Sequence, residues 1–260
     1  MKIDFKNLPF MQKTREDGTR RGGIEDLVVA SNPKSSFAEA VKSIKTNLMF
    51  SSVEKEAKVV LITSPESGDG KSFLAANLAT AFSQDGKKVL IIDGDMRKGR
   101  QHEIFGVVND PTAGYSNYIL KYKDMDDAGM MAFIRPEMYI RQTRVPSVYL
   151  LPAGPTPPNP LELISSENNR RLINSLRDQY DLVIIDCPPA LGLSDALVMS
   201  KYSDINVVCV SNAKTKIEEL ESVKKSFEKV NSKISGVVIN KAKVKGGSYS
   251  SYYADEYYSK

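Results

Sequence analysis

Residues 64–72, SPESGDGKS, form a glycine-rich segment between a continuous apolar run and a helical stretch. Gly68 and Gly70 allow the backbone to wrap closely around an anion. Successive backbone N–H groups and the N-terminus of the following helix then point at phosphate oxygens. In such an arrangement Lys71 reaches the β- and γ-phosphates, and the hydroxyl of Ser72 ligates a magnesium ion.

This segment, called the phosphate loop below, predicts that the chain binds ATP together with Mg²⁺. Asp69 and Phe73 adjoin its key residues and are included among the predicted nucleotide-binding residues. The usual motif has a glycine where Pro65 stands, but the strand–loop–helix context supports the same interpretation. An ordinary glycine-rich turn is the alternative, and Gly-Lys-Ser at the head of a helix argues against it.

Aspartates follow two other apolar runs. VLIIDGDMRK carries Asp93 and Asp95, and VIIDCPP carries Asp186. Buried strands that end in carboxylates at a phosphate-binding edge make sense if a divalent cation lies there, because Mg²⁺ is held by few protein carboxylates and several waters. One carboxylate close to the γ-phosphate can accept a proton from an attacking hydroxyl. The alternative is that these aspartates only cap helices.

Several residues near these motifs have more than one interpretation. Arg97 could stabilise the charge of a transferring phosphoryl group or pair with Asp95. Asn240 ends an apolar run and could contact the adenine or cap a turn. His102 is the single histidine and is assigned a structural role. The lysines of residues 241–245 are expected to be solvated, with docking of a negative partner as the alternative.

Apolar strand-like runs alternate with amphipathic helical stretches from residue 58 onward. This order predicts βαβ units, and therefore an α/β fold with a doubly wound, mostly parallel sheet and helices on both faces. Such a sheet brings the carboxyl ends of its strands to one edge, where ligands bind. The predicted strands lie within residues 58–64, 87–95, 147–154, 180–189, 205–212 and 235–240.

The chain divides into three parts by composition. Residues 1–33 are polar and mixed in charge, which predicts a loosely held arm. Residues 34–242 are predicted to form the nucleotide-binding domain, beginning with an amphipathic helix at 34–52 that Ser35 or Ser36 caps. Residues 243–260 are polar and rich in Gly, Ser and Tyr, and are predicted to be a disordered tail.

The bulk composition excludes several classes of protein. The net charge of +4 over 260 residues is mild, so no nucleic acid is expected as a partner. No apolar run approaches the roughly 20 residues of a membrane span, and the first residues lack the apolar segment of a signal peptide. The two cysteines, Cys187 and Cys209, lie in apolar runs and are expected to be buried thiols. Together these features predict a cytoplasmic protein.

Five of the twelve tyrosines lie within the last twelve residues. A core role is implausible in so polar a segment, and flexible flanks would let a phenol reach an active site. Phosphoacceptor function is therefore the leading interpretation, with base stacking or a sticky interaction tail as the alternatives. The tyrosines are Tyr249, Tyr252, Tyr253, Tyr257 and Tyr258.

Taken together, these motifs resemble the bacterial tyrosine kinases, or BY-kinases, of capsule and exopolysaccharide systems. The resemblance covers residues 33–260. LITSPESGDGKS is similar to the Walker A motif of this family, VLIIDGDMRK to its Walker A′ motif, and VIIDCPP to its Walker B motif. AGPTPPNPLELI, EAVKSIKTNLMF and the tyrosine cluster are similar to its proline-rich segment, its oligomerisation helix and its tail.

The resemblance implies an ATP- and Mg²⁺-dependent protein-tyrosine autokinase with the following roles. Asp93 would be the base that activates the tyrosine, while Asp95 and Asp186 would support the metal together with Ser72. A homo-oligomeric ring, a transmembrane activator of the polysaccharide co-polymerase type, and a position at the inner face of the membrane are also implied. Other proteins with accessible tyrosines are possible further substrates.

Two departures from the family pattern bear on these expectations. Ser67-Gly68 stands where the family commonly has Pro-Gly. The oligomerisation helix has Glu39, Lys42 and Lys45 where the family has Glu and two Arg, and Lys lacks the bidentate fork of Arg. Partition and septum-placement ATPases share the fold but carry a signature lysine where this chain has Glu66. An ATPase switch of that kind and an ATP-binding assembly scaffold remain the alternative functions.

Overall fold

The computed structural model describes residues 23–50, 57–123, 135–212 and 214–242. The predicted tail at 243–260 and its five tyrosines lie outside the described residues, as do residues 1–22 of the predicted arm. No helix among the described residues is long and apolar enough to cross a membrane.

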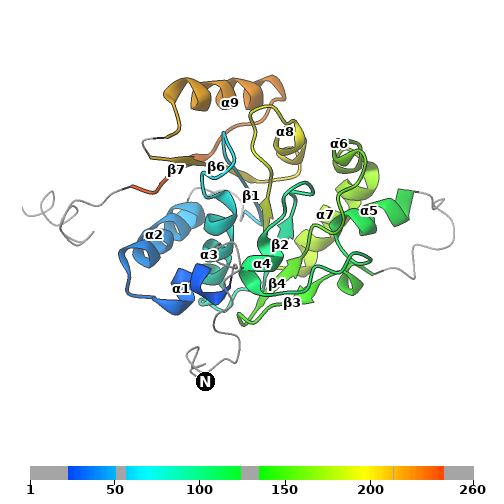
Figure 1. Cartoon of the computed structure of the whole chain (residues 1–260), viewed down its shortest axis with the longest axis horizontal. Helices are drawn as coiled ribbons and strands as arrows, with labels where there is room; N and C mark the ends of the chain where they lie inside the picture. Colours follow the sequence, from blue (N-terminus) through cyan, green and yellow to red (C-terminus); the bar gives the residue numbers. More distant parts are fainter. Residues whose placement is uncertain (1–22, 51–56, 124–134, 213, 243–260) are drawn as a thin grey trace, which may run out of the picture.

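The described strands form one sheet in the order β3-β4-β2-β5-β1-β6-β7 (Figure 1). Neighbouring strands are parallel throughout, except that the edge strand β3 pairs antiparallel with β4. The prediction of a doubly wound, mostly parallel sheet is thereby confirmed. The strands are β1 Val59–Thr63, β2 Val89–Asp93, β3 Arg141–Gln142, β4 Val148–Leu151, β5 Leu182–Asp186, β6 Ile205–Ser211 and β7 Gly236–Asn240.

The helices cover both faces of the sheet (Figure 1). One face carries α1 Val28–Ser31, α2 Ser36–Phe50, α3 Lys71–Ser83 and α4 Gln101–Phe105. The other carries α5 Tyr115–Lys123, α6 Pro160–Ile164, α7 Glu167–Gln179, α8 Asp195–Met199 and α9 Ile217–Lys229. Short 3₁₀ turns occur at η2 Ile24–Asp26 and η3 Pro136–Met138.

The central strands supply both hydrophobic cores because successive residues point to opposite faces. In β1, Val59 and Leu61 belong to the core under α5–α9, whereas Val60 and Ile62 belong to the core under α1–α4. β2 and β5 alternate in the same way and are fully buried. Strands that are buried on both faces read as continuous apolar runs, which explains why they could be recognised from the sequence.

The segment before α2 packs against the domain, so the prediction of a loosely held arm is wrong for residues 23–33. Leu27 and Val29 are buried against the core that α3 helps to form. The buried side chain of Asn77, on α3, accepts a hydrogen bond from the N–H of Val29 at 3.0 Å and donates one to the carbonyl of Asp26 at 2.8 Å. Two apolar residues and one buried amide therefore contribute to docking a segment whose composition is mostly polar.

α2 forms where the apolar spacing predicts a helix, but it begins at Ser36 rather than at residue 34. Residues 51–52 of the predicted helix lie outside the described residues. The hydroxyl of Ser35 accepts a hydrogen bond from the N–H of Ala38 at 3.1 Å, so Ser35 is the cap. The aromatic rings of Phe37 and Phe73 are 4.9 Å apart between centroids and join α2 to α3.

Replacing Asn77 with Ala leaves the N–H of Val29 and the carbonyl of Asp26 without their partner. We expect a loss of about 2–3 kcal/mol in the free energy of unfolding, because unsatisfied buried polar groups are costly. Chemical denaturation measures the loss, and limited proteolysis measures exposure of residues 23–33. Asn174→Ala, at an exposed position on α7, is the matched control. A loss no larger than the control's would show that α1 is not held through Asn77.

Candidate active site

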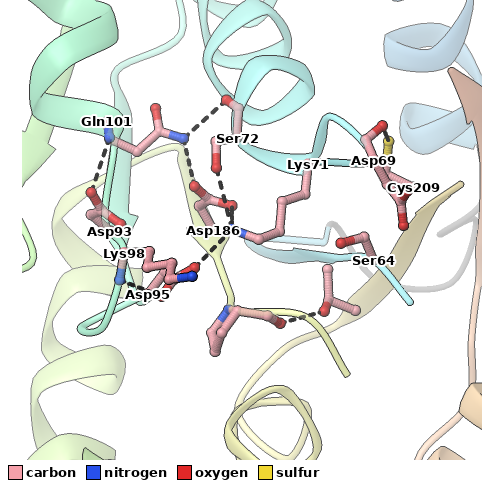
Figure 2. A network of polar contacts seen from close by, with 12 residues as sticks. Ser64, Asp69, Lys71, Ser72, Asp93, Asp95, Lys98, Gln101, Asp186 and Cys209 are labelled. Carbon is pink, nitrogen blue, oxygen red and sulfur yellow. Dashed lines mark hydrogen bonds and ion pairs between the residues drawn. The ribbon is translucent and has the colours of Figure 1, made fainter. Parts of the chain in front are cut away.

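The predicted catalytic groups meet at the carboxyl ends of three adjacent strands, β2, β5 and β1 (Figure 2). Asp93 ends β2 and Asp186 ends β5, and these two residues are partners in the parallel register. The phosphate loop follows β1 and leads into α3. Because the three strands are neighbours, residues more than 90 positions apart in the sequence come together around one point.

The phosphate loop has the backbone that its glycines predict. Gly68 and Gly70 have φ angles of +88° and +102°, which side chains strongly disfavour. Gly70 is also the N-cap of α3, and no side chain among the described residues caps this end of the helix. A Cβ atom on Gly70 would lie 1.9 Å from Nδ2 of Asn240, so a larger residue would have to displace the Asn240 side chain. The loop therefore presents an uncapped helix N-terminus, which favours an anion.

Lys71 lies among three carboxylates. Its Nζ is 3.0 Å from Oδ2 of Asp95 and 3.6 Å from Oδ1 of Asp186, and it donates to Oγ of Ser72 at 3.3 Å. Burial by itself lowers the pKa of Lys71, but the charges of Asp186, Asp95 and Asp93 and the hydrogen bond to Asp95 together raise it above its ordinary value. The ammonium is therefore charged and partly balances the carboxylates.

Asp93 is fully buried, and only one of its two carboxylate oxygens has a hydrogen-bond partner among the described residues. Its Oδ2 accepts a hydrogen bond from the N–H of Gln101 at 3.0 Å, whereas its Oδ1 has no partner among the described residues. Burial and the charge of Asp186 raise the pKa of Asp93 well above its ordinary range, against the opposing effects of Gln101 N–H and Lys71. The proton affinity of this carboxyl is therefore high for an aspartate, which suits a group that accepts a proton.

Gln101 links the motifs and was not among the site residues predicted from the sequence. Its Nε2 donates to Oδ2 of Asp186 at 2.8 Å and to the carbonyl of Ser72 at 3.0 Å. The side chain thus fixes the Walker B carboxylate against the first turn of α3, while its backbone holds Asp93. Its position eight residues after Asp93, next to His102, is the sequence signal that was available.

Two buried carboxylate oxygens of this centre, Oδ1 of Asp93 and Oδ1 of Asp186, have no hydrogen-bond partner among the described residues. Oε1 of Gln101 is also without a partner there, but it points away from the two aspartates (Figure 2). Hard oxygen donors of this kind suit Mg²⁺. The described residues include no group of three or more His, Cys, Asp and Glu side chains placed to hold a metal by themselves. Both observations fit an ion that takes a hydroxyl such as that of Ser72, one or two carboxylates, waters and nucleotide phosphates as ligands.

One of the two interpretations from the sequence was that Arg97 pairs with Asp95, and the structure shows that the two side chains do not form an ion pair. Arg97 instead extends to α8, where its Nη2 is 3.6 Å from Oδ1 of the buried Asp195. Asp95 accepts a hydrogen bond from the N–H of Lys98 at 2.9 Å in addition to its ion pair with Lys71. The side chain of Arg97 remains 38% exposed at the rim of the site.

The remaining predicted nucleotide-binding residues serve the loop itself. Oδ2 of Asp69 accepts from the N–H of Glu66 at 2.9 Å, and Nδ2 of Asn240 donates to the carbonyl of Asp69 at the same distance. The ring of Phe73 packs on Phe37 rather than facing the site. Both cysteines are free and buried, as predicted.

The residues of the predicted oligomerisation motif contact their own chain. Nζ of Lys42 is 2.7 Å from Oε1 of Glu39, one turn earlier on α2. Lys45 forms an ion pair with Asp85, just beyond α3, and its side chain is only 13% exposed. Lys45 therefore helps to hold α2 against the end of α3.

A family model described as an AAA domain matches residues 57–238. CapB of Staphylococcus aureus, which carries a tyrosine-protein kinase name, is 39% identical over 91% of this chain and 99% of its own length. The tyrosine-protein kinase YwqD of Bacillus subtilis is 36% identical over 88% of this chain and 91% of its own.

The chain belongs to the bacterial tyrosine kinase family. The crystal structure of the chimerical protein CapA2B2 agrees, with 35% identity and a TM-score of 0.76 over 86% of this chain and 94% of that one. The chain is thus a tyrosine-protein kinase of the capsule and exopolysaccharide type, built on a nucleotide-binding P-loop fold.

Asp93→Asn in this tyrosine kinase should stabilise the protein in the absence of nucleotide. The raised pKa of Asp93 means that the folded state binds more protons than the unfolded state above the ordinary aspartate pKa, so wild-type stability falls as pH rises. Asn keeps an acceptor for the N–H of Gln101 and removes that dependence. We expect the gain in unfolding free energy over the wild type to increase from pH 5 to pH 8.

Denaturant titrations of both proteins at several pH values, without nucleotide or metal, measure this gain. Asp178→Asn, at an exposed position on α7, is the control for loss of one carboxylate. A gain in unfolding free energy that is independent of pH, or a loss that grows with pH, would contradict the assignment of Asp93 as a buried carboxylate with a raised pKa.

Proposed function

We propose that this chain is an ATP- and Mg²⁺-dependent protein-tyrosine autokinase that phosphorylates the tyrosines of residues 249–258. The observation that carries the proposal is the convergence of Lys71 and Ser72 of the phosphate loop with Asp93 and Asp186 at adjacent strand ends. This arrangement offers an anion site, a cation site and a proton acceptor within a single buried centre.

In the proposed reaction, the phenol oxygen attacks the γ-phosphorus of ATP in line with the leaving ADP oxygen. The carboxylate of Asp93 takes the phenolic proton, and Lys71 balances the charge on the transferring group and on ADP. Ser72, Asp95 and Asp186 would hold Mg²⁺, which would supply further charge neutralisation. Arg97 lies at the rim, where it can contact the incoming substrate or the transferring phosphoryl group. Positioning and electrostatics supply most of the rate.

The choice of Asp93 as base rests on its surroundings. It is fully buried, one of its oxygens is unpartnered, and its pKa is raised by burial and by Asp186. Asp95 is committed to Lys71 and to the N–H of Lys98, and Oδ2 of Asp186 to Gln101. Among these three described residues, Asp93 is the one that forms no ion pair with Lys71, so its carboxylate is the one we assign to take the proton.

We place the acceptor tyrosines in trans, in a ring-like homo-oligomer whose subunits exchange tails. Each phosphate adds about −1.5 to −2 charges. Several phosphates on a short segment repel one another and the neighbouring Asp255 and Glu256, so phosphorylation loosens the assembly. The exposed Glu39–Lys42 pair on α2 is the part of the proposed oligomerisation motif that a neighbouring subunit can reach.

The proposed setting is capsule or exopolysaccharide synthesis and export, which the kinase regulates through its phosphorylation state. A transmembrane activator of the polysaccharide co-polymerase type would hold it at the cytoplasmic face of the membrane. The names of the relatives and of the CapA2B2 chimera support this setting. Other cytoplasmic proteins with exposed tyrosines are possible further substrates.

Two variants, one without a working active site and one without acceptor tyrosines, test transfer between subunits. Lys71→Met removes the phosphate-binding ammonium, and a second variant replaces all five tail tyrosines with Phe while keeping the site. Each alone should incorporate no tail phosphate with Mg-ATP, with or without a candidate activator. Mixed together, they should phosphorylate the tail of the Lys71→Met chain, as peptide mass mapping detects.

Three results would count against parts of this proposal. Absence of tail phosphate in the wild type under both conditions would remove the autokinase function. Wild-type phosphorylation without transfer in the mixture would place the reaction in cis. Release of inorganic phosphate at an unchanged rate in the five-Phe variant, with no phosphotyrosine in the wild type, would instead support an ATPase switch.

Asp93→Asn is expected to lower phosphotyrosine formation at least about a hundred-fold, because general-base catalysis contributes about that much. Binding of Mg-ADP, measured by calorimetry, should persist, since the phosphate loop is untouched. The exposed-site variant Asp178→Asn should leave both quantities unchanged. Near-wild-type transfer by Asp93→Asn would exclude Asp93 as the base.

A further inference from the structure

The phosphate loop is held from its outer side by side chains that bond its carbonyl groups. Four consecutive carbonyls accept hydrogen bonds, those of Glu66, Ser67, Gly68 and Asp69. The donor to Glu66 is the hydroxyl of Ser64, within the loop itself. The donors to the other three come from β6, from the segment after it, and from the end of β7, all more than 135 positions away in the sequence.

Two of these donors are lysine ammonium groups. Nζ of Lys214 lies 3.1 Å from the carbonyl oxygen of Ser67, and Nζ of Lys241 lies 2.7 Å from that of Gly68. Lys214 also approaches two carboxylates of the loop, at 3.3 Å from Oε2 of Glu66 and 3.7 Å from Oδ1 of Asp69. One ammonium group thus spans the loop from position 66 to position 69.

The third carbonyl is held by the strand ends themselves. Nδ2 of Asn240 and Sγ of Cys209 both donate to the carbonyl of Asp69, at 2.9 and 3.4 Å. Asn240 pairs with Ser211 in the β6–β7 register, and the N–H of Asn212 donates to its carbonyl at 2.8 Å. The two groups that hold the carbonyl of Asp69 are therefore fixed to the sheet.

Holding the carbonyls determines where the N–H groups point. In a planar trans peptide unit the N–H and the C=O point in opposite directions. A loop that wraps an anion must turn its N–H groups inward and its carbonyls outward. Glycines make that conformation accessible, but they also allow the loop to adopt other conformations. Donors on the outer side restrict this freedom, so the conformation is prepared before the nucleotide arrives.

We propose that Lys214 and Lys241 are positioning residues that fasten the outer, carbonyl side of the phosphate loop, and so raise the affinity of the kinase for nucleotide. The inference rests on the proposed ATP site and concerns how this chain shapes it. Neither ammonium group is assigned contact with the nucleotide. Both act through the backbone of Ser67 and Gly68.

The test compares Lys214→Met and Lys241→Met with the wild type for binding of Mg-ADP by calorimetry. Met keeps the length of the stem and the positive φ of residue 241, but it cannot donate. Each variant should raise the Kd about three- to ten-fold, the value of one lost hydrogen bond. The KM for ATP should rise by the same factor, while kcat for tail phosphorylation changes less than about two-fold.

Two further variants separate positioning from a general effect of charge. Lys225→Met removes a positive charge from an exposed position on α9 and should leave the Kd and KM unchanged. Lys241→Arg keeps a charged donor and should restore most of the affinity. If the lysines act only by attracting a polyanion, Lys225→Met shares the effect and high salt abolishes it.

The binding measurements distinguish failure of the positioning role from failure of the proposed function. A wild type that binds neither Mg-ADP nor Mg-ATP would refute the nucleotide site itself. A wild type that binds, with both Met variants within two-fold of it, would refute the positioning role alone. Because the two lysines lie in separate segments, a folding defect in one variant, seen in the thermal melt, leaves the other to decide.

Discussion

Three buried carboxylates around a single ammonium group are the constraint on which the rest of this molecule depends. Asp93 and Asp186 are fully buried and Asp95 is nearly so. Within the part of the chain that the structure describes, Lys71 is the cationic side chain that forms ion pairs with this cluster, through Asp95 and Asp186. Repulsion among the carboxylates is strong because the interior screens charge poorly. The raised pKa of Asp93 is one sign of this, and the unpartnered oxygens are another. Such a cluster is unfavourable for folding, so its retention is explained by binding and chemistry rather than by stability.

The scaffold supports this cluster because of how a parallel sheet is built. β2, β5 and β1 are buried on both faces and supply two separate cores. Their fixed register places Asp93 opposite Asp186, and the backbone N–H of Gly94 bonds the carbonyl of Asp186 at 2.8 Å. The Cα atoms of the two aspartates cannot move apart without breaking this ladder. A rigid sheet thus keeps groups together that would separate if they lay on loops.

Features of this structure could be predicted from the sequence where the residues that determine them are neighbours in the chain. The phosphate loop and the strand-ending aspartates could be predicted because motif, strand and helix are contiguous, and parallel topology then brings them together. Gln101, Lys214 and Asp195 could not, because their roles depend on partners tens to more than a hundred residues away. The docking of residues 23–33 was missed because it depends on Leu27, Val29 and the buried amide of Asn77, which no average over a polar segment reveals.

In the proposed ATP site, Lys71 would connect nucleotide binding to cation binding. In the structure its ammonium is shared between Asp95 and Asp186, where it offsets their repulsion. A phosphate group bound in the loop would compete for the same ammonium group. When Lys71 moves from the carboxylates to the phosphate, the repulsion among the carboxylates is no longer offset, and this cost reduces the favourable free energy of phosphate binding. A divalent cation held by these carboxylates would supply positive charge in place of Lys71 and would lower this cost. Each ligand therefore lowers the free energy of binding the other, and the coupling arises from the charges of this chain without any change of fold.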